Sequence, residues 1–255
     1  MTEYFPPDVA PTGQLLQDLV IELHTSFGIR SHVLTSQPHY KKDAEPAPRM
    51  EKMPWGFIQR VPALTSSRHS VLSRIKGFAW NFFAFLAASH GLPKAKAVIV
   101  SSNPPTLPLV AALHARMRGQ GFRILVDDIY PNIASVLGVI KKGGLTETLW
   151  RRFNAAIYSQ ATGLITLGSY MKAVLKEMYP DSSVDVAPYW APPEIQPIEK
   201  SDSHFAKAEQ LNDTFVVLYS GNHGRLHNLE QLIELASILK DEAFTFVFVG
   251  DGAKR

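Results

Sequence analysis

The 255 residues contain 45% hydrophobic and 19% charged residues, which are the proportions of a globular protein and exclude a largely disordered chain. The net charge of +3 is too small to predict a partner among nucleic acids, although it suits anionic substrates or a membrane surface. Because cysteine is absent, disulfides, thiolate catalysis and thiolate metal sites are excluded, and the histidines show no metal-ligand spacing.

The chain opens with MTEYFPPDVAPTG, which has no basic region followed by an apolar run. No secretory signal peptide is visible, so a cytoplasmic location is predicted. Only four residues precede Phe5-Pro6-Pro7, and the first strand of an α/β domain is therefore expected to be absent or cut short.

The loop from Asp8 to Gly13 leads into a predicted helix over Gly13–Phe27. The free N–H groups at the start of such a helix can bind a phosphate, and Gly13 lets a ligand approach the backbone closely. The alternative is a simple turn in which Thr12 is the N-cap.

Short apolar runs alternate with helical patterns along most of the chain. This alternation predicts an α/β fold with a parallel sheet and right-handed crossovers. The predicted strands are Ser31–Ser36, Ala97–Ser102, Phe122–Asp127, Gly163–Leu167 and Ser183–Ala187. The predicted helices, besides Gly13–Phe27, are Leu107–Arg118, Leu145–Ala161 and Tyr170–Met178.

The segment Val71–Ser89 is the most apolar and aromatic part of the chain, but its uninterrupted apolar part is too short to span a bilayer. One interpretation is a core helix. The other is a helix lying in a membrane interface, with Arg68, Arg74 and Lys76 near lipid headgroups. On that interpretation the inserted aromatic residues are Phe78, Trp80, Phe82, Phe83 and Phe85.

Two adjacent carboxylates, Asp127 and Asp128, close a predicted buried strand. Ligands of parallel sheets bind at the carboxyl ends of the strands, and only one of two adjacent side chains can face a given cleft. Asp128, further past the strand, is the candidate for contacting an acceptor hydroxyl or acting as a base. The alternative is that one of the two caps the following helix.

The polar, proline-containing segment Ala191–Asn212 predicts a connection between a domain over 1–190 and a second block over 213–255. That block reads as strand, helix and strand, with glycine loops after both strands. The first loop contains Gly221 and Asn222, followed by Arg225, whose guanidinium could bind a diphosphate in a bidentate manner. The alternative for Arg225 is a surface residue beside an ordinary turn.

The second glycine loop begins at Gly250 and Asp251 and ends with the sequence. One strand–helix–strand unit cannot bury both faces of its strands, so the second domain is expected to be incomplete here. A complete G-x-G-x-x-G pattern is absent, which disfavours a nicotinamide-dependent enzyme.

Five segments, YFPPDVAPTGQLLQDL, SSNPPTLPLVAAL, VDDIYPNIASVLGVIKKGGL, VLYSGNHGRLHNLEQLIELASIL and FVFVGDGAKR, occur in the order seen in bacterial glycosyltransferase family four. The chain resembles the branch that makes polysaccharides such as colanic acid and O-antigen. The resemblance implies a GT-B fold, with two Rossmann-like domains and the active site between them. It also implies retaining transfer of a hexose or N-acetylhexosamine from a nucleotide-diphosphate sugar, with no cofactor and no required metal.

By this resemblance, the N-terminal domain binds a glycan or lipid-linked acceptor at the inner face of the cytoplasmic membrane, and the C-terminal domain binds the donor. Arg225 matches the arginine that neutralises the departing diphosphate, and Asp128 lies in the acceptor-side loop. Trp80, Phe82 and Phe83 are the candidate membrane or acceptor contacts. The proposed donor-binding residues are Gly13, Gly221, Asn222, Arg225, Gly250 and Asp251.

The chain departs from the family pattern after Arg225, where Leu226-His227-Asn228-Leu229 contains no lysine. The acidic E-x7-E-type motif would lie beyond Arg255, so this chain is not expected to catalyse the transfer alone. Two alternatives are a non-catalytic remnant that binds a membrane or a partner through the Trp80 region, and a nucleotide-sugar epimerase of similar architecture.

Overall fold

The computed structural model describes residues 1–41, 43–63, 71–191, 195–224 and 227–254, with only the helical backbone for residues 71–75. The chain divides into two compact units, Met1–Pro192 and Pro193–Arg255. The division falls within the connection predicted from the sequence.

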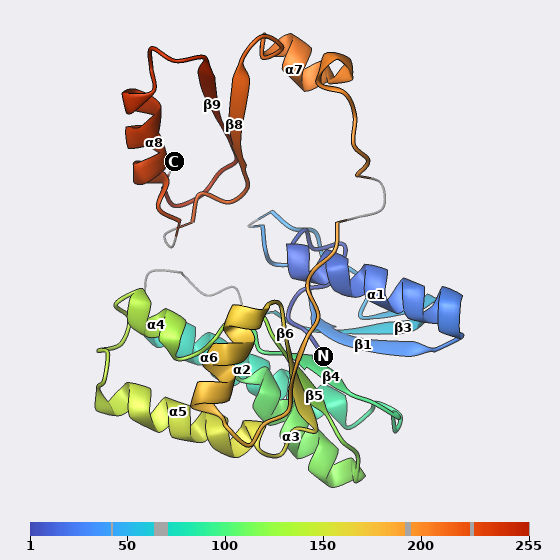
Figure 1. Cartoon of the computed structure of the whole chain (residues 1–255). Helices are drawn as coiled ribbons and strands as arrows, with labels where there is room; N and C mark the ends of the chain where they lie inside the picture. Colours follow the sequence, from blue (N-terminus) through green and yellow to red (C-terminus); the bar gives the residue numbers. More distant parts are fainter. Residues whose placement is uncertain (42, 64–70, 192–194, 225–226, 255) are drawn as a thin grey trace. The chain divides into compact units, whose positions relative to one another are not determined.

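Unit 1 alternates strands and helices (Figure 1). Its strands are β1 (Ser31–Ser36), β2 (Met50–Met53), β3 (Gly56–Val61), β4 (Ile99–Ser101), β5 (Arg123–Val126), β6 (Gly163–Thr166) and β7 (Val184–Val186). Its helices are α1 (Pro11–Phe27), α2 (Val71–Ser89), α3 (Leu107–Arg118), α4 (Asn132–Val136), α5 (Leu145–Tyr158) and α6 (Ser169–Met178).

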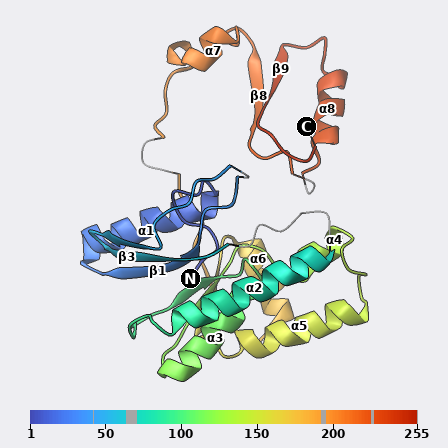
Figure 2. The ribbon, with the colours of Figure 1, turned by 180° about the vertical axis from the view of Figure 1, so that it is seen from behind.

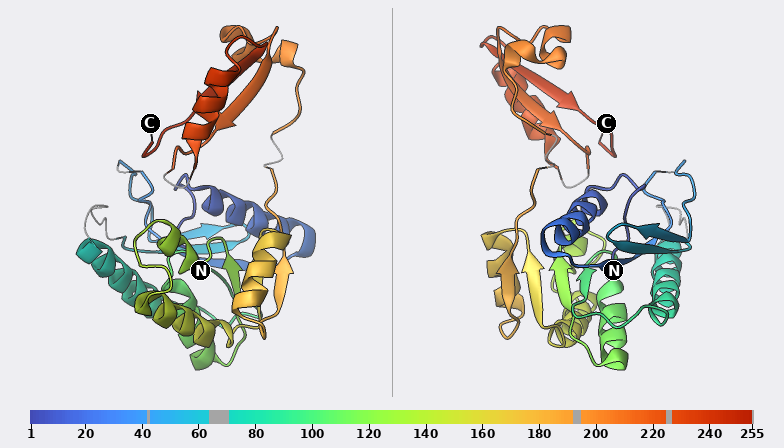
Figure 3. Two further views of the ribbon diagram at one scale, coloured as in Figure 1. Left: turned by 60° about the vertical axis from the view of Figure 1, so that its left-hand side comes forward. Right: turned by 90° about the vertical axis from the view of Figure 1, so that its right-hand side faces the viewer.

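The strands of unit 1 form two groups, ordered β1-β3-β2 and β4-β5-β6-β7. The second group is entirely parallel, and its strands lie side by side in Figure 3. In the first group β1 and β3 are parallel, while β2 is antiparallel to β3. The predicted parallel α/β architecture is therefore confirmed, with one antiparallel edge strand that the sequence patterns did not predict.

Residues 1–3 join the two groups of strands. On one side the Thr2 N–H donates to the Leu34 carbonyl at 3.1 Å, and the Ser36 N–H donates to the Glu3 carbonyl at 3.2 Å. On the other side the Met1 nitrogen and carbonyl bond to β4, with distances of 2.7 and 3.0 Å. The first strand was expected to be absent or cut short. Residues 1–3 are not assigned as a regular strand, in line with that expectation, but their backbone lies between β1 and β4 and bonds to both.

The main core lies on the face of the sheet that carries α2, α3 and α5. Side chains at paired positions of neighbouring strands form a buried row, made of Val100, Ile124, Leu164 and Val184. Phe85 of α2, which is fully buried, belongs to the same core. In parallel sheets the crossover helices pack on such rows of apolar side chains, which occupy paired positions of neighbouring strands.

Helix α1 covers the opposite face (Figures 1 and 2). Phe5, Val33, Trp55 and Ile58 form a second buried cluster, against which Leu16 and Val20 of α1 pack. The two faces of β1 are thus buried by different helices, because Val33 and Leu34 point to opposite sides of the strand.

Unit 2 contains the parallel pair β8 (Phe215–Ser220) and β9 (Phe244–Val249), joined by α8 (Leu229–Ile238). Within the predicted connection lie a short 3₁₀ helix (Lys200–Asp202) and α7 (His204–Ala208). The strand–helix–strand reading of this part of the sequence is confirmed.

The predicted strands and helices are all present, with ends displaced by up to three residues. Thr12 is not an N-cap, because α1 begins at Pro11 after Ala10. Neither Asp127 nor Asp128 caps α4, which follows Pro131 without a side-chain cap. The elements that the sequence patterns did not indicate are β2, β3, α4, α7 and the 3₁₀ helix.

Candidate functional site at the carboxyl ends of the strands

Asp127, directly after β5, is bonded at both carboxylate oxygens. The Ser101 hydroxyl at the end of β4 donates to one oxygen at 2.9 Å, and the Tyr189 hydroxyl, from the segment after β7, donates to the other. Burial raises the pKa of Asp127, although both of these hydrogen bonds act to lower it. With its oxygens engaged, Asp127 serves to join three strand ends.

Asp128, the predicted acceptor contact, is half-buried in the next position. Its carboxylate forms no hydrogen bond within the described part of the chain, and the Ser102 hydroxyl lies near its backbone only, at 3.4 Å. Burial, and then the charge of Asp127, raises the pKa of Asp128. Of the two adjacent carboxylates, Asp128 is the one whose oxygens are left for a ligand.

Tyr130 lies two residues past Asp128, and its ring stacks on Trp150 with a centroid separation of 5.6 Å. Burial, assisted by the charges of Asp128 and Glu3, raises the pKa of Tyr130 to about 12. The phenol therefore stays protonated and can donate a hydrogen bond at neutral pH.

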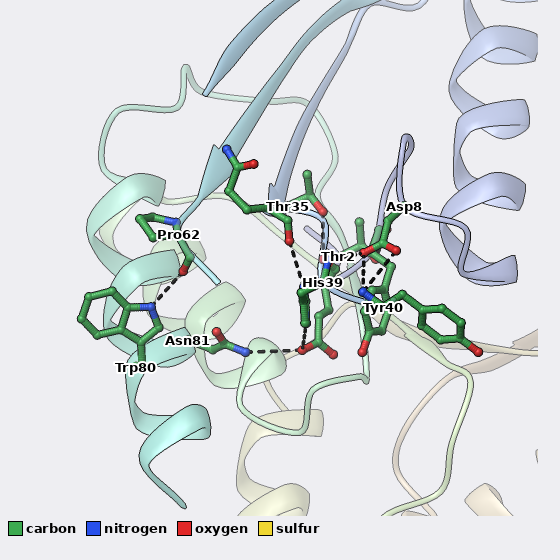
Figure 4. A network of polar contacts seen from close by, with 11 residues as sticks. Thr2, Asp8, Thr35, His39, Tyr40, Pro62, Trp80 and Asn81 are labelled. Carbon is green, nitrogen blue, oxygen red and sulfur yellow. Dashed lines mark hydrogen bonds and ion pairs between the residues drawn. The ribbon is translucent and has the colours of Figure 1, made fainter. Parts of the chain in front are cut away.

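A second polar network includes His39, in the loop that follows β1, and Asn81 (Figure 4), and both contact the Glu3 carboxylate. Glu3 Oε1 lies 3.3 Å from His39 Nε2 and 3.4 Å from Asn81 Nδ2 of α2. The other ring nitrogen of His39 lies 2.9 Å from the Gln37 carbonyl. Since both ring nitrogens face oxygen acceptors, the geometry fits the doubly protonated imidazolium.

Burial by itself lowers the pKa of His39, but its bonds to Glu3 and Gln37 and the charges of Glu3 and Asp8 raise it, and the net direction is upward. When His39 is protonated, its imidazolium therefore lies near the carboxylates of Glu3 and Asp8 at this edge of the sheet.

Gly13 lies near the start of α1, against the backbone that leaves the first strand. A Cβ at Gly13 would lie 3.0 Å from the Tyr4 carbonyl carbon and oxygen and from the Phe5 Cα. The close approach that requires glycine here is thus between helix and strand within the protein. Its predicted role beside donor phosphates stays a prediction.

The aromatic residues of α2 divide between its two sides. Phe85 is fully buried and Phe82 packs against the main core, whereas Phe83 and Trp80 are 65% and 45% exposed. The predicted insertion of Phe85 into lipid is therefore wrong, and Phe82 faces the core because it lies on the same side of the helix as Phe85. The Trp80 indole N–H donates to the Pro62 carbonyl at 2.8 Å, as Figure 4 shows.

In unit 2 the two glycine loops pack against each other at the carboxyl ends of β8 and β9. The His223 N–H donates to the Asp251 carbonyl at 2.8 Å, and the Gly221 N–H donates to the Val249 carbonyl at 2.9 Å. A Cβ at Gly250, where φ is +151°, would lie 1.9 Å from the Gly221 carbonyl oxygen, so only glycine allows this contact.

These contacts bring together the predicted donor residues Gly221, Asn222, Gly250 and Asp251. Gly221 itself has a φ of +150°, and nothing lies within 4 Å of where its Cβ would be. That open side exposes backbone that a ligand can approach. Arg225, the predicted diphosphate contact, lies outside the described residues.

Neither of two surface cavities coincides with the predicted residues. One, of about 330 Å³, is lined by the end of α3 and by residues 119–122, at the amino end of β5, and therefore at the opposite edge of the sheet from Asp128. The other, of about 450 Å³, lies between Phe205, Leu211 and β9. Within the described ranges, no group of three or more His, Asp or Glu side chains could hold a metal ion.

The structure adds Glu3, Asp8, His39 and Tyr189 to the residues chosen from the sequence. His39 and Tyr189 each lie two or three residues past a predicted strand, at the positions where ligands of parallel sheets bind. The strand-end rule would have found both. Glu3 gave no such signal, because its strand was expected to be missing.

Comparison with known proteins relates the chain to glycosyltransferases. No protein-family model matches the sequence. Over 193 residues, the chain is 31% identical to the probable glycosyltransferase WbjE of Pseudomonas aeruginosa, a match that covers 74% of this chain and 48% of that protein. The chain thus spans about half the length of this relative.

Among solved structures, sucrose-phosphate synthase from Thermosynechococcus elongatus matches with a TM-score of 0.66 and 15% identity. The match covers 94% of this chain and 57% of that one. At this identity the likeness concerns the fold, which is of the GT-B type. The fold class predicted from the sequence is confirmed. In the described part of the chain, no helix is long and apolar enough to cross a bilayer.

Proposed function

We infer that this chain, a relative of the GT-B glycosyltransferases, takes part in moving a sugar from a nucleotide-diphosphate sugar to a glycan acceptor in the synthesis of a cell-surface polysaccharide. The observation that carries the proposal is the gathering of polar groups at the carboxyl ends of the strands in both units, since ligands bind there in α/β sheets. The retaining course of the transfer and the lipid-linked nature of the acceptor are parts of the proposal.

In unit 1 we assign the acceptor to the edge around Asp128. A half-buried carboxylate that no other described residue bonds can accept a hydrogen bond from a sugar hydroxyl, and a raised pKa makes it a better base. Tyr130, which stays protonated, can donate to another sugar oxygen. Sugars are recognised by such combinations of acceptors, donors and aromatic faces.

In unit 2 we assign the donor to the paired glycine loops. The backbone at Gly221 is open on one side, and the N-terminus of α8 follows this loop within the chain. Backbone N–H groups near a helix N-terminus favour a diphosphate. Arg225 would add a charge-assisted bond to the departing diphosphate, which stabilises the leaving group.

A second candidate function is membrane attachment through α2 at the inner face of the cytoplasmic membrane. Trp80 and Phe83 lie one turn apart on its exposed side, in line with Lys76, and the helix contains no acidic residue. An aromatic stripe beside positive charge suits a lipid interface. A lipid-linked acceptor would then lie near the same edge of the sheet, since Asn81 of α2 contacts Glu3.

Calorimetric titration of the chain with a panel of nucleotide-diphosphate sugars, which varies base and sugar, tests the proposed function. We expect one donor class to bind, and its free nucleoside diphosphate to compete for the same site. A chain that binds none of these donors contradicts the proposal. Binding of nicotinamide dinucleotides instead would favour a different enzyme on this fold.

A further inference from the structure

The Tyr189 hydroxyl lies between two distant parts of unit 1. It donates to the Asp127 carboxylate after β5, and it interacts electrostatically with the Thr12 side chain in the first turn of α1. Thr12 is the neighbour of Gly13, and Asp127 is the neighbour of Asp128. The contact therefore connects the two places where the sequence predicted ligand-binding groups in unit 1.

The connection includes β4 as well. Ser101 donates to the second oxygen of Asp127 at 2.9 Å, and the same hydroxyl accepts the Asn103 N–H at 3.2 Å. Three loops at the carboxyl edge, those after β4, β5 and β7, are thus held through one carboxylate. The first turn of α1 joins them through Tyr189.

We propose that Tyr189 is a positioning residue of the acceptor site: its hydroxyl fixes Asp127 relative to the start of α1 and thereby holds the adjacent Asp128 in place. This inference rests on the proposed function, and it adds a residue that neither the sequence patterns nor the resemblance assigned. Tyr189 acts through Asp127 and touches neither substrate.

The geometry gives Tyr189 this role for two reasons. The carboxylate of Asp128 has no hydrogen bond within the described part of the chain, so its position depends on the local backbone, which Asp127 and the long bonds to the Ser102 hydroxyl anchor. Tyr189 is 38% exposed, so burial alone holds its ring weakly, and the hydrogen bond from its hydroxyl to Asp127 fixes its orientation.

Tyr189→Phe removes the hydroxyl and keeps the ring. Tyr170→Phe, on the exposed tyrosine of α6, is the matched control. Carbon-13 NMR titration of the aspartate carboxyls measures the first effect: we expect the pKa of Asp127 to rise in Tyr189→Phe, because the phenol donates to the ionised carboxylate. A pKa of Asp127 that is the same in both variants overturns the inference.

Ligand binding measures the second effect, with p-nitrophenyl glycosides as acceptor probes and the donor found by calorimetry. We expect Tyr189→Phe to weaken glycoside binding by roughly 2- to 10-fold, the scale of one lost hydrogen bond, and to leave donor affinity unchanged. If the affinities for glycoside and donor fall equally, Tyr189 has a merely structural role and the inference is overturned. An unchanged affinity for the glycoside also overturns the inference.

The two proposals fail in different ways. If the wild-type chain binds neither donors nor glycosides, the proposed function is contradicted, whatever Tyr189→Phe does to Asp127. If the wild type binds both and Tyr189→Phe binds both equally well, the proposed function stands and only the role of Tyr189 is rejected.

Discussion

The buried carboxylate of Asp8 accepts the backbone N–H of Tyr40, which lies 32 residues later in the chain, at 3.1 Å. The same carboxylate accepts the N–H groups of His39 at 2.9 Å and of Val9 at 3.0 Å. One side chain therefore joins the loop before α1 to the loop after β1. Both loops border the network around Glu3 (Figure 4).

Asp8→Ala should destabilise unit 1 by about 2–3 kcal/mol, because it leaves N–H groups in a partly buried site without their charged acceptor. Urea unfolding, compared at equal m-values, measures the effect. Asp181→Ala, at an exposed position, is the control and should change the free energy of unfolding by less than about 0.5 kcal/mol. Equal midpoints for both variants would contradict the anchoring role.

The raised pKa of His39 makes part of the stability dependent on pH. Because its folded-state pKa lies above the unfolded value of about 6.5, the imidazolium stabilises the fold fully below that pH, and this contribution is lost as the pH rises through the folded-state pKa. We expect the stability advantage of the wild type over His39→Gln to shrink over the pH range above about 6.5, the unfolded value. Urea midpoints measured across this range, with exposed His204→Gln as control, would show no such trend if His39 were neutral.

Gly13→Ala should destabilise the protein by roughly 1–3 kcal/mol, the scale of overpacking, despite the better helix propensity of alanine. The new Cβ would meet backbone atoms of Tyr4 and Phe5, and that backbone is fixed by the adjoining strand bonds. Gly168→Ala is the matched control, because nothing lies within 4 Å of its Cβ position. Thermal unfolding of both variants measures the difference. A Gly13→Ala protein as stable as the wild type would mean that the backbone of Tyr4 and Phe5 can move to accommodate the Cβ at little energetic cost.

Arg225→Ala should weaken binding of the nucleotide-diphosphate donor by about 1.5–3 kcal/mol, the scale of charge-assisted hydrogen bonds. Calorimetry with the donor identified for the wild type measures the effect. Arg152→Ala, an exposed arginine on α5, removes an equal charge elsewhere and should leave the affinity unchanged. Unchanged affinity in Arg225→Ala removes the arginine from the proposed donor site.

Phe83→Ser should lower the affinity of the chain for anionic phospholipid vesicles by about tenfold or more, since burying a phenyl group contributes roughly 1.5–3 kcal/mol. Co-sedimentation with the vesicles measures this affinity. The comparison is Phe27→Ser, at the end of α1, where the side chain is 71% exposed against 65% for Phe83. Both variants should stay folded, because neither ring lies in the core. If the two variants bind vesicles alike, α2 is not the lipid-binding face.

Periodicity was sufficient to predict the parallel α/β plan, because each strand is a short apolar run and each crossover helix carries its own pattern. It was insufficient for β2 and β3. Their sequences, MEKM and GFIQRV, contain charged residues and lie on either side of Pro54-Trp55. Their conformation is decided by pairing, of β3 with β1 and of β2 with β3. The position of residues 1–3 is likewise set by non-local contacts, since their backbone hydrogen bonds go to β1 and β4.

The candidate site shows the same division. Asp128 could be chosen from the sequence because it follows a strand, and the glycine loops of unit 2 could be chosen for the same reason. That Asp127 is engaged by Ser101 and Tyr189 could not be predicted, because those residues lie 26 and 62 positions away along the chain.

Taken by itself, the sequence determined which segments form strands and helices, which residues lie at strand ends, and the family that the chain resembles. These properties depend on neighbouring residues, whose spacing is visible in one dimension. Only the tertiary structure decided which of two adjacent carboxylates has no hydrogen bond within the described residues, which aromatic residues of α2 face outward, and that the surroundings of His39 raise its pKa. Burial and hydrogen bonding between distant segments set those properties, and neither is local in sequence.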